Sequence, residues 1–443
     1  MKRWLKGLLA AGVVIILILF SLVGKIDRTQ LPDQQFYQQM TKTLSNLQPT
    51  LHPASQPLRA GWGKVSITPS YPMPMAGYRM RPTFDAVHDS LYARIIGINN
   101  GSISCYFISL DLLLFPPAIK EILQKKLVKE FSEMPFLYLS ATHTHNGIGG
   151  WHNSIVGELV LGNYDEAWVN NVADDLVVKI KQIEKSMKPA QMSYWEADAS
   201  EYAENRLVPG APYDGFLRGI QLLREDSSQA QLITYSAHAT SISKKSKSLS
   251  GDYPATLIKK LERENSFGLF MAGMVGSHRL AGLKEQEFEL VEKAGEVLYQ
   301  KIKNTTYDQL LDSIEIKSAH IPIQFGPAQL RITKNIKLRN WAFSWLLNPL
   351  QGELTFLQLG NLIFIGTPCD FSGEIYVNKK LNDLAMASEK KLIITSFNGN
   401  YAGYITEDEH YDKINKEEVM ALNWVGPYYG NYFSEMISTL IKK

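Results

Sequence analysis

Ser140-Ala-Thr-His-Thr-His-Asn-Gly-Ile-Gly-Gly150 follows a short apolar run, Phe136–Leu139, that is typical of a buried strand. Its three glycines allow the backbone to approach a ligand closely. If the strand continues through the histidines, His143 and His145 point to the same face about 6–7 Å apart, because side chains alternate along a strand. Such a pair can serve a metal ion and its substrate together. The alternative is a pair of polar residues in a surface loop, unless distant segments supply further ligands.

The composition describes a chain that can bury a large core and has no electrostatic preference for nucleic acid. Of its 443 residues 45% are hydrophobic, and 46 basic against 44 acidic residues give a net charge of +2. This balance argues against nucleic acid as a partner. Cys105 and Cys369 each lie in an apolar run, which indicates two buried thiols rather than a disulfide framework. No pattern in the chain indicates an oligomeric state.

The N-terminal segment, residues 1–24, has the pattern of a transmembrane helix that anchors the protein. Three basic residues precede an uncharged run, Gly7–Gly24, which is rich in Leu, Val and Ile and about long enough to cross a bilayer. The basic flank predicts a cytoplasmic N-terminus and a single-pass membrane protein with an extracytoplasmic catalytic domain. A cleaved signal peptide, which would leave the protein secreted, is the alternative, but Ser21–Gly24 matches a cleavage site poorly.

Beyond this segment the chain predicts a linker and one large domain. Residues 25–57 are polar and contain several prolines, so we expect a linker with one helical piece at Phe36–Leu47. From residue 58 to residue 443 runs of strand and helix character alternate, and an Asn-Asn-Gly turn at residues 99–101 joins two apolar strands. Hairpins mixed with long helices predict a multilayer α/β domain in which helices flank mixed β-sheets.

Three further segments place polar side chains just beyond apolar runs. His238 follows Leu232–Tyr235. Asp370 follows an apolar strand and a proline turn, and Tyr404 lies in a tyrosine-rich loop after another strand. Open α/β sheets build sites at strand ends, so these side chains are candidates to complete a site with His143. Taken singly, each also has a structural interpretation: Asp370 as a helix cap, His238 as a core histidine and Tyr404 as a rim residue.

Together these segments resemble the neutral/alkaline non-lysosomal ceramidase family in its catalytic N-terminal domain. The most specific match is Ser-Ala-Thr-His-Thr-His-x-Gly-x-Gly-Gly, which is complete in Ser140–Gly150. Shorter matches on both sides of this stretch occur in the family's order. They are Gly63–Thr68, Met75–Tyr78, Leu91–Arg94, Ser109–Asp111, Asn205-Arg206, His238–Ser241, Ser250–Tyr253, Pro368–Phe371, and Tyr401 with Tyr404. The resemblance covers residues 58–443 and implies an α/β fold, a zinc site and hydrolysis of a lipid amide.

The resemblance implies that one Zn2+ is held by four ligands from distant segments: His143, His238, Asp370 and Tyr404. Zinc lowers the pKa of a bound water toward ~7, and the resulting hydroxide can attack an amide carbonyl. The resemblance places His145 and Arg206 at that carbonyl, where they would orient it and stabilise the developing oxyanion. Asp111, at the end of a predicted strand, would support the site from beside the ligands.

Three departures from the family pattern affect the site. The family acid is Glu, whereas this chain has Asp370, with Glu374 as a nearby alternative. The family's catalytic serine aligns with Arg279, and Ser277 is the nearby, out-of-register serine that we keep as a catalytic candidate. A further active-site tyrosine of the family aligns with Lys416. A zinc-activated water does not require the serine. The Ser140–Gly150 stretch matches the family pattern completely, whereas the segment around Ser277 has changed.

The sequence therefore predicts a membrane-anchored zinc amidohydrolase of sphingolipid metabolism that cleaves the N-acyl bond of ceramide or a related lipid amide. The departures leave two alternatives. One is a catalytically degenerate, membrane-anchored binding protein, and the other is a metal hydrolase of another amide or ester. An aromatic segment, Asn340–Leu347, stays open between a helix packed in the core and an interfacial lid.

Overall fold

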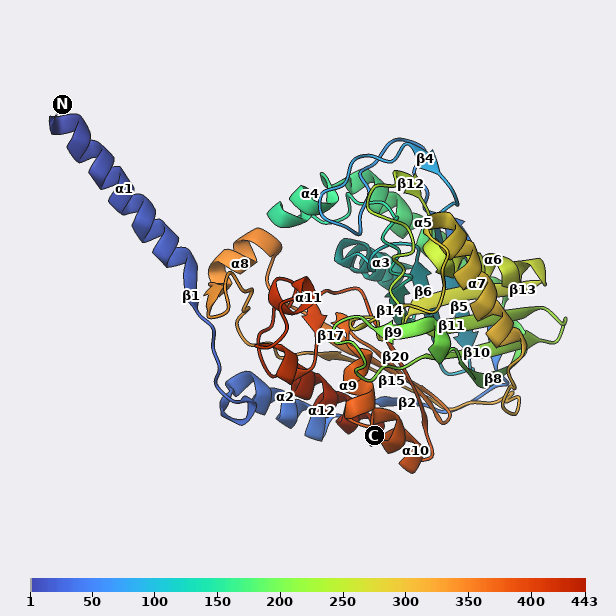
Figure 1. The fold of residues 1–443 in the computed structure, drawn as a ribbon. Coiled ribbons are helices and arrows are strands. Elements are labelled where there is room, and N and C mark those ends of the chain that lie inside the picture. Colours follow the sequence, from blue (N-terminus) through green and yellow to red (C-terminus); the bar gives the residue numbers. More distant parts are fainter. Residues whose placement is uncertain (1) are drawn as a thin grey trace.

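Two β-sheets form the centre of the computed structural model, which describes residues 2–443 (Figure 1). The larger sheet has the strand order β13-β11-β10-β8-β3-β5-β6-β7, and the smaller has the order β2-β15-β17-β18-β20. The strands of the larger sheet are β3 (Arg59–Ser66), β5 (Tyr92–Asn99), β6 (Ser104–Leu110), β7 (Phe136–Ala141), β8 (Lys188–Asp198), β10 (Phe216–Arg224), β11 (Gln229–Tyr235) and β13 (Ser266–Ala272). Those of the smaller sheet are β2 (Thr50–His52), β15 (Ile316–Pro322), β17 (Glu353–Leu359), β18 (Leu362–Gly366) and β20 (Lys391–Thr395).

Helices pack on the outer faces of both sheets, which gives four layers in the order helix, sheet, sheet, helix (Figure 1). The larger sheet is covered by α3 (Pro117–Glu130), α5 (Glu166–Ser186), α6 (Asp252–Arg263) and α7 (Glu287–Lys303). The smaller is covered by α2 (Gln35–Asn46), α9 (Gly373–Asn378), α10 (Leu381–Ala387) and α12 (Tyr429–Ile441). Shorter elements lie at strand ends and edges: β1 (Val23–Lys25), β4 (Ala86–Val87), α4 (Ile155–Leu161), β9 (Ala203–Asn205), β12 (Ser248–Leu249), β14 (His278–Leu280), β16 (Ile336–Leu338), α8 (Asn340–Leu347), β19 (Asp370–Phe371), β21 (Tyr404–Ile405) and α11 (Glu417–Met420).

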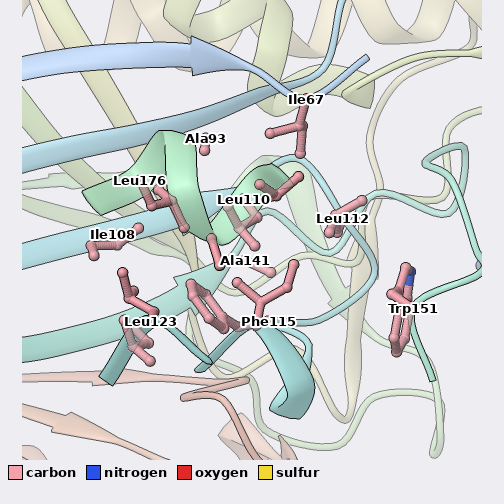
Figure 2. Packing of buried hydrophobic residues seen from close by; sticks show 14 of the residues in the cluster. Ile67, Ala93, Ile108, Leu110, Leu112, Phe115, Leu123, Ala141, Trp151 and Leu176 are labelled. Carbon is pink, nitrogen blue, oxygen red and sulfur yellow. The ribbon is translucent and has the colours of Figure 1, made fainter. Parts of the chain in front are cut away.

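The alternation of side chains along the strands explains these layers. In β6, Phe107 belongs to the core between the sheets, whereas its neighbour Ile108 belongs to the core under α3 and α5. In β18, Phe364 faces Phe107, with their ring centroids 5.2 Å apart, and Ile365 packs with the helices of the other layer. Figure 2 shows the helical side of this arrangement around Ile108. Both faces of each sheet are therefore buried, as the predicted mixed α/β architecture requires.

The expected transmembrane anchor is wrong. Lys2–Leu22 form α1, which projects from the body (Figure 1), and among the described residues no helix is long and apolar enough to cross a membrane. The basic residues lie within α1, and β1 follows directly, so the uncharged helical run from Gly7 to Leu22 has 16 residues. Its length of roughly 24 Å falls short of a hydrocarbon core of ~30 Å.

The predicted single-pass membrane localisation and the predicted membrane contact through the N-terminal helix both depended on this anchor. The structure supports neither of them. Met1 and the side chains of residues 2, 3, 6, 10 and 14–19, which the predicted anchor includes, lie outside the described residues.

Residues 25–57, expected to form a polar linker, pair and pack with the body of the molecule. The strand β2 pairs with β15, and β1, which ends at residue 25, pairs with β16. The expected helical piece is α2, which buries Met40 and Leu44 against the smaller sheet's outer face. These apolar side chains, spaced four residues apart, give the segment a helix face that a solvated linker would leave exposed.

The aromatic segment forms α8, and its side chains divide between core and surface. Ala342 and Phe343 are buried, whereas Trp341 and Trp345 are 53% and 66% exposed. The two tryptophans are therefore surface residues, and only one side of the helix packs in the core.

Candidate metal centre

The four side chains predicted as metal ligands meet where strands of both sheets end. His143 follows β7, and His238 follows β11. Asp370 and Tyr404 lie in the two-residue strands β19 and β21, which follow β18 and β20. These short strands pair in parallel, with Asp370 opposite Tyr404. The structure thus places side by side residues that are far apart in the sequence.

The backbone at His143 turns instead of continuing the strand. β7 ends at Ala141, and His143 has a left-handed φ of 62°. The imidazoles of His143 and His145 consequently meet edge to face, with their Nε2 atoms 3.3 Å apart, closer than a strand would place them. The loop carrying Gly77 packs directly on this turn, since a Cβ on Gly77 would lie 2.3 Å from the Cα of His145.

Backbone carbonyls orient two of the imidazoles. The Nδ1 atom of His143 lies 2.6 Å from the carbonyl oxygen of Leu113, and Nδ1 of His238 lies 2.8 Å from that of Val275. A carbonyl oxygen only accepts, so each Nδ1 carries the proton and each Nε2 carries the lone pair that can bind a metal. This is the second contact by which metal-binding histidines are usually held in one tautomer and orientation.

The carboxylate of Asp370 faces both of these lone pairs. Its Oδ1 lies 3.3 Å from Nε2 of His143 and 3.5 Å from Nε2 of His238. This oxygen is buried and has no hydrogen-bond donor, while Oδ2 accepts a 2.7 Å hydrogen bond from Tyr401. Burial raises the pKa of Asp370 to about 7. A buried oxygen without a donor, opposite two imidazole lone pairs, is an arrangement that a bound cation stabilises.

The separations between these atoms fit one small cation. The Tyr404 hydroxyl lies 3.0 Å from Nε2 of His238, so the four candidate ligands are joined by contacts of 3.0 to 3.5 Å. Nitrogen and oxygen ligands at 2.0–2.2 Å from a tetrahedral zinc ion lie roughly 3.3–3.6 Å from one another. The donor set of two imidazoles, a carboxylate and a phenol therefore fits a zinc ion.

His145 is a third imidazole at the same point. Among the described residues, His143, His145 and His238 form a group whose ligand atoms all lie within 4.8 Å of one another. Burial lowers the pKa of His143 to about 3 and holds the pKa values of the other two well below the usual histidine value. All three rings are therefore neutral near pH 7, which is the form that binds a metal or donates one N–H to a substrate.

Arg206 lies beside the phenol of the cluster. β9 and β14 pair antiparallel, and the Arg206 backbone N–H donates to the carbonyl of Ser277. Its guanidinium Nη2 donates to the Tyr404 hydroxyl at 3.1 Å and lies 3.0 Å from a carboxylate oxygen of Glu418. Its Nε is buried and has no hydrogen-bond partner, so one donor stays available to a ligand.

Ser277 is not oriented toward the candidate ligands. Its buried hydroxyl accepts a hydrogen bond from the backbone N–H of Glu374 at the start of α9, and it lies 3.4 Å from Nδ1 of His278. Glu374, the alternative acidic ligand, instead contacts Nε2 of His410 at 3.0 Å and the amide of Asn205 at 3.1 Å. The serine segment thus forms a supporting framework next to the cluster.

The other departures also have structural partners. Arg279, which aligns with the family's serine, forms an exposed ion pair with Glu204. Lys416, which aligns with the family's tyrosine, donates from Nζ to the carbonyl of Arg206. Asp111 accepts a hydrogen bond from the Tyr92 backbone N–H, and burial raises its pKa to about 6. It lies two residues before the carbonyl that orients His143.

Two residues at the cluster have no role in the sequence analysis. Tyr401 hydrogen-bonds to Asp370, and its signal was its place in the tyrosine-rich loop, three residues before Tyr404. Glu418 contacts Arg206. In the sequence it follows another glutamate in a short polar segment, and this gives no local pattern that would mark it as a site residue.

Comparisons with known proteins agree with this fold. Residues 58–275 match the family model described as neutral/alkaline non-lysosomal ceramidase, N-terminal. The chain is similar to a solved neutral ceramidase from Pseudomonas aeruginosa, with 16% identity and a TM-score of 0.75 over 88% of this chain and 75% of that one. It is also similar to a structure described as ceramidase complexed with C2, with 15% identity and a TM-score of 0.76 over 87% and 75% of the two chains. At these identities the likeness shows a shared fold.

The four-layer α/β fold with its candidate metal centre and the family match together support a hydrolase. The family match is more specific: residues 58–275 match the N-terminal domain of the neutral/alkaline non-lysosomal ceramidase family. The resemblance predicted from the Ser140–Gly150 stretch is confirmed.

Proposed function

We propose that the protein is a zinc-dependent amidohydrolase that cleaves the N-acyl bond of ceramide or a related lipid amide, which yields a fatty acid and an amine. One observation carries the proposal: His143, His238, Asp370 and Tyr404 are joined by contacts of 3.0 to 3.5 Å in one buried cluster. The family and the shared fold support the lipid-amide substrate.

These four residues would hold the ion. Bound zinc would supply a Lewis acid that lowers the pKa of water toward ~7 and polarises a carbonyl. His145 and Arg206 act on the substrate, because Nε2 of His145 lies 3.3 Å from Nε2 of His143 and Nε of Arg206 is buried without a hydrogen-bond partner. Both would donate to the carbonyl oxygen as negative charge develops on it, in the manner of an oxyanion hole.

The proposal does not require Ser277. Its hydroxyl accepts from the first turn of α9 and therefore supports the backbone that follows Asp370. In this mechanism water is the nucleophile, and the substrate-facing donors are an imidazole and a guanidinium. The catalytic role predicted for Ser277 thus becomes a structural one in the proposed mechanism.

Metal analysis of the purified protein tests the proposal. We expect about one zinc per chain, lost in His143→Ala and His238→Ala and retained in His88→Ala, a control histidine on the surface paired with Asp89. Hydrolysis of a fluorescent ceramide should stop with a chelator and return with added zinc. A folded protein that binds no metal, or hydrolysis that a chelator leaves unchanged, would refute the zinc mechanism.

A non-catalytic lipid-amide-binding protein is the second candidate, and the orientation of Ser277 away from the cluster favours it. The same experiment separates the two. Zinc and ceramide binding without release of fatty acid would support the binding protein. Release of acid from esters or other amides, but not from ceramide, would support a related hydrolase.

A further inference from the structure

The charge of Arg206 is offset by a residue outside the cluster of candidate ligands. Nη2 of Arg206 lies 3.0 Å from Oε1 of Glu418, and each side chain is 18% exposed. The same Nη2 donates to the Tyr404 hydroxyl at 3.1 Å. Glu418 and Tyr404 therefore both contact one nitrogen of the guanidinium, which fixes its orientation next to the candidate metal centre.

The segment that carries Glu418 is itself held in place by its neighbours. Lys416, just before α11, donates to the backbone carbonyl of Arg206, so this segment contacts both the main chain and the side chain of that arginine. Val419 is fully buried, and its carbonyl accepts from the guanidinium of Arg331. Since the backbone on both sides of Glu418 is fixed, its carboxylate has little freedom to leave Arg206.

The pair has a chemical consequence for a site that releases a carboxylate. A partly buried guanidinium without a counter-ion binds carboxylates strongly through charge-assisted hydrogen bonds. In the proposed reaction the substrate is a neutral amide and one product is a fatty-acid anion. A cation without a partner at this position would retain that product, whereas a paired one still offers N–H donors to a neutral carbonyl.

We propose that Glu418 is a positioning residue that holds the Arg206 guanidinium beside Tyr404 and offsets its charge, so that the site accepts a neutral amide and releases a carboxylate. This rests on the proposed function for its substrate and product. Nothing in the local sequence pattern assigns a role to Glu418, and its contact with Arg206 is the observation behind the role.

The test compares Glu418→Gln with Glu417→Gln in the full, zinc-loaded chain. Glutamine keeps the shape and removes the charge. Glu417 is the matched control, since it is the adjacent glutamate and pairs with Arg79 in an exposed contact at 2.9 Å. Glu418→Asp keeps the charge on a shorter side chain and serves as the conservative variant.

Two readouts are measured, binding of octanoate by calorimetry and kcat and KM with a short-chain fluorescent ceramide. Loss of a charge-assisted contact predicts octanoate binding that is about tenfold tighter in Glu418→Gln. We expect a lower kcat with little change in KM, stronger inhibition by octanoate and an unchanged zinc content. Glu418→Asp should lie between this variant and the wild type, and Glu417→Gln should match the wild type.

Octanoate binding within twofold of wild type in Glu418→Gln, or an equal effect in Glu417→Gln, would overturn the inference. If Glu418→Gln does not fold, Glu418→Asp decides by the same readout: unchanged octanoate affinity refutes the inference, and tighter binding supports it. A wild-type protein that hydrolyses no ceramide would refute the proposed function alone, because octanoate binding still reports on the pair.

Discussion

Replacing Tyr401 by phenylalanine removes one hydroxyl and should weaken zinc binding by about 10- to 100-fold. The hydroxyl donates a 2.7 Å hydrogen bond to Oδ2 of Asp370, while the ring packs on Phe397 and Trp424 in contacts that phenylalanine keeps. A hydrogen bond to a charged group contributes about 1.5–3 kcal/mol. Burial raises the pKa of Asp370 and this hydrogen bond opposes the rise, so its loss favours the proton over the metal.

The affinity is measured at pH 7 by competition with a chromogenic chelator, with circular dichroism as the check on folding. Tyr376→Phe is the matched control, because Tyr376 is buried and its hydroxyl has no hydrogen-bond partner among the described residues. It should bind zinc as the wild type does. If Tyr401→Phe also binds zinc with wild-type affinity, Tyr401 does not orient Asp370 as a zinc ligand, and the reasoning from this hydrogen bond is refuted.

Three further predictions concern stability. Burial would raise the pKa of Glu353, but hydrogen bonds and charges from a histidine and a lysine hold it at about 2, below the usual 4.5. The stability that this carboxylate contributes is therefore present above pH 4.5 and lost toward pH 2. In Glu353→Gln the decrease in the free energy of unfolding between pH 6 and pH 3, measured with urea, should be smaller by about 2 kcal/mol. Gly77→Ala, which would clash with His145, should cost about 1–3 kcal/mol and lower activity, more than Gly210→Ala, where a positive φ faces open space; equal effects would contradict the packing. Phe364→Ala, between the sheets, should cost about 3–5 kcal/mol, and a loss below about 1 kcal/mol would rule out that core position.

Much of the secondary structure was predictable because its signals are local. The Asn-Asn-Gly turn at residues 99–101 joins β5 and β6, and Gly101 has the positive φ that such a turn needs. In α5 the buried residues Val169, Val172, Leu176 and Ile180 recur at the three- and four-residue spacing of a helix face. The sheet order was not predictable, since β3 pairs with both β5 and the distant β8, and no short window of sequence contains both partners.

The anchor prediction failed for a physical reason that a hydropathy pattern does not contain. Composition places Gly7–Gly24 in one apolar run, but where the helix ends depends on what the next residues pair with. Val23–Lys25 pair with β16, and the Arg339 guanidinium donates to the Val23 carbonyl, so the helix stops at Leu22. Tertiary pairing overrides the local helical preference here.

The candidate site shows the same division between local and distant information. Seen alone, His238, Asp370 and Tyr404 each had a structural interpretation. Their places after apolar runs made them candidates for one site, and the family resemblance assigned them to one metal ion. The spacing of His143 and His145 was misjudged because a left-handed residue, not a continuing strand, sets it. Asp370 meets Tyr404 through paired strands of two residues each, which are too short to leave a period-two pattern.

The substrate-facing half of the site now depends on fewer residues than the family pattern implies. Ser277 accepts from the α9 backbone, and Lys416 binds the Arg206 carbonyl instead of presenting a phenol. In the proposed mechanism Arg206 and His145 are the donors left to a substrate carbonyl, and Arg206 contacts Tyr404 and Glu418. Glu418 contacts Arg206 and is not one of the four proposed zinc ligands. The proposal therefore separates two properties: loss of Glu418 should change product release and kcat while zinc stays bound.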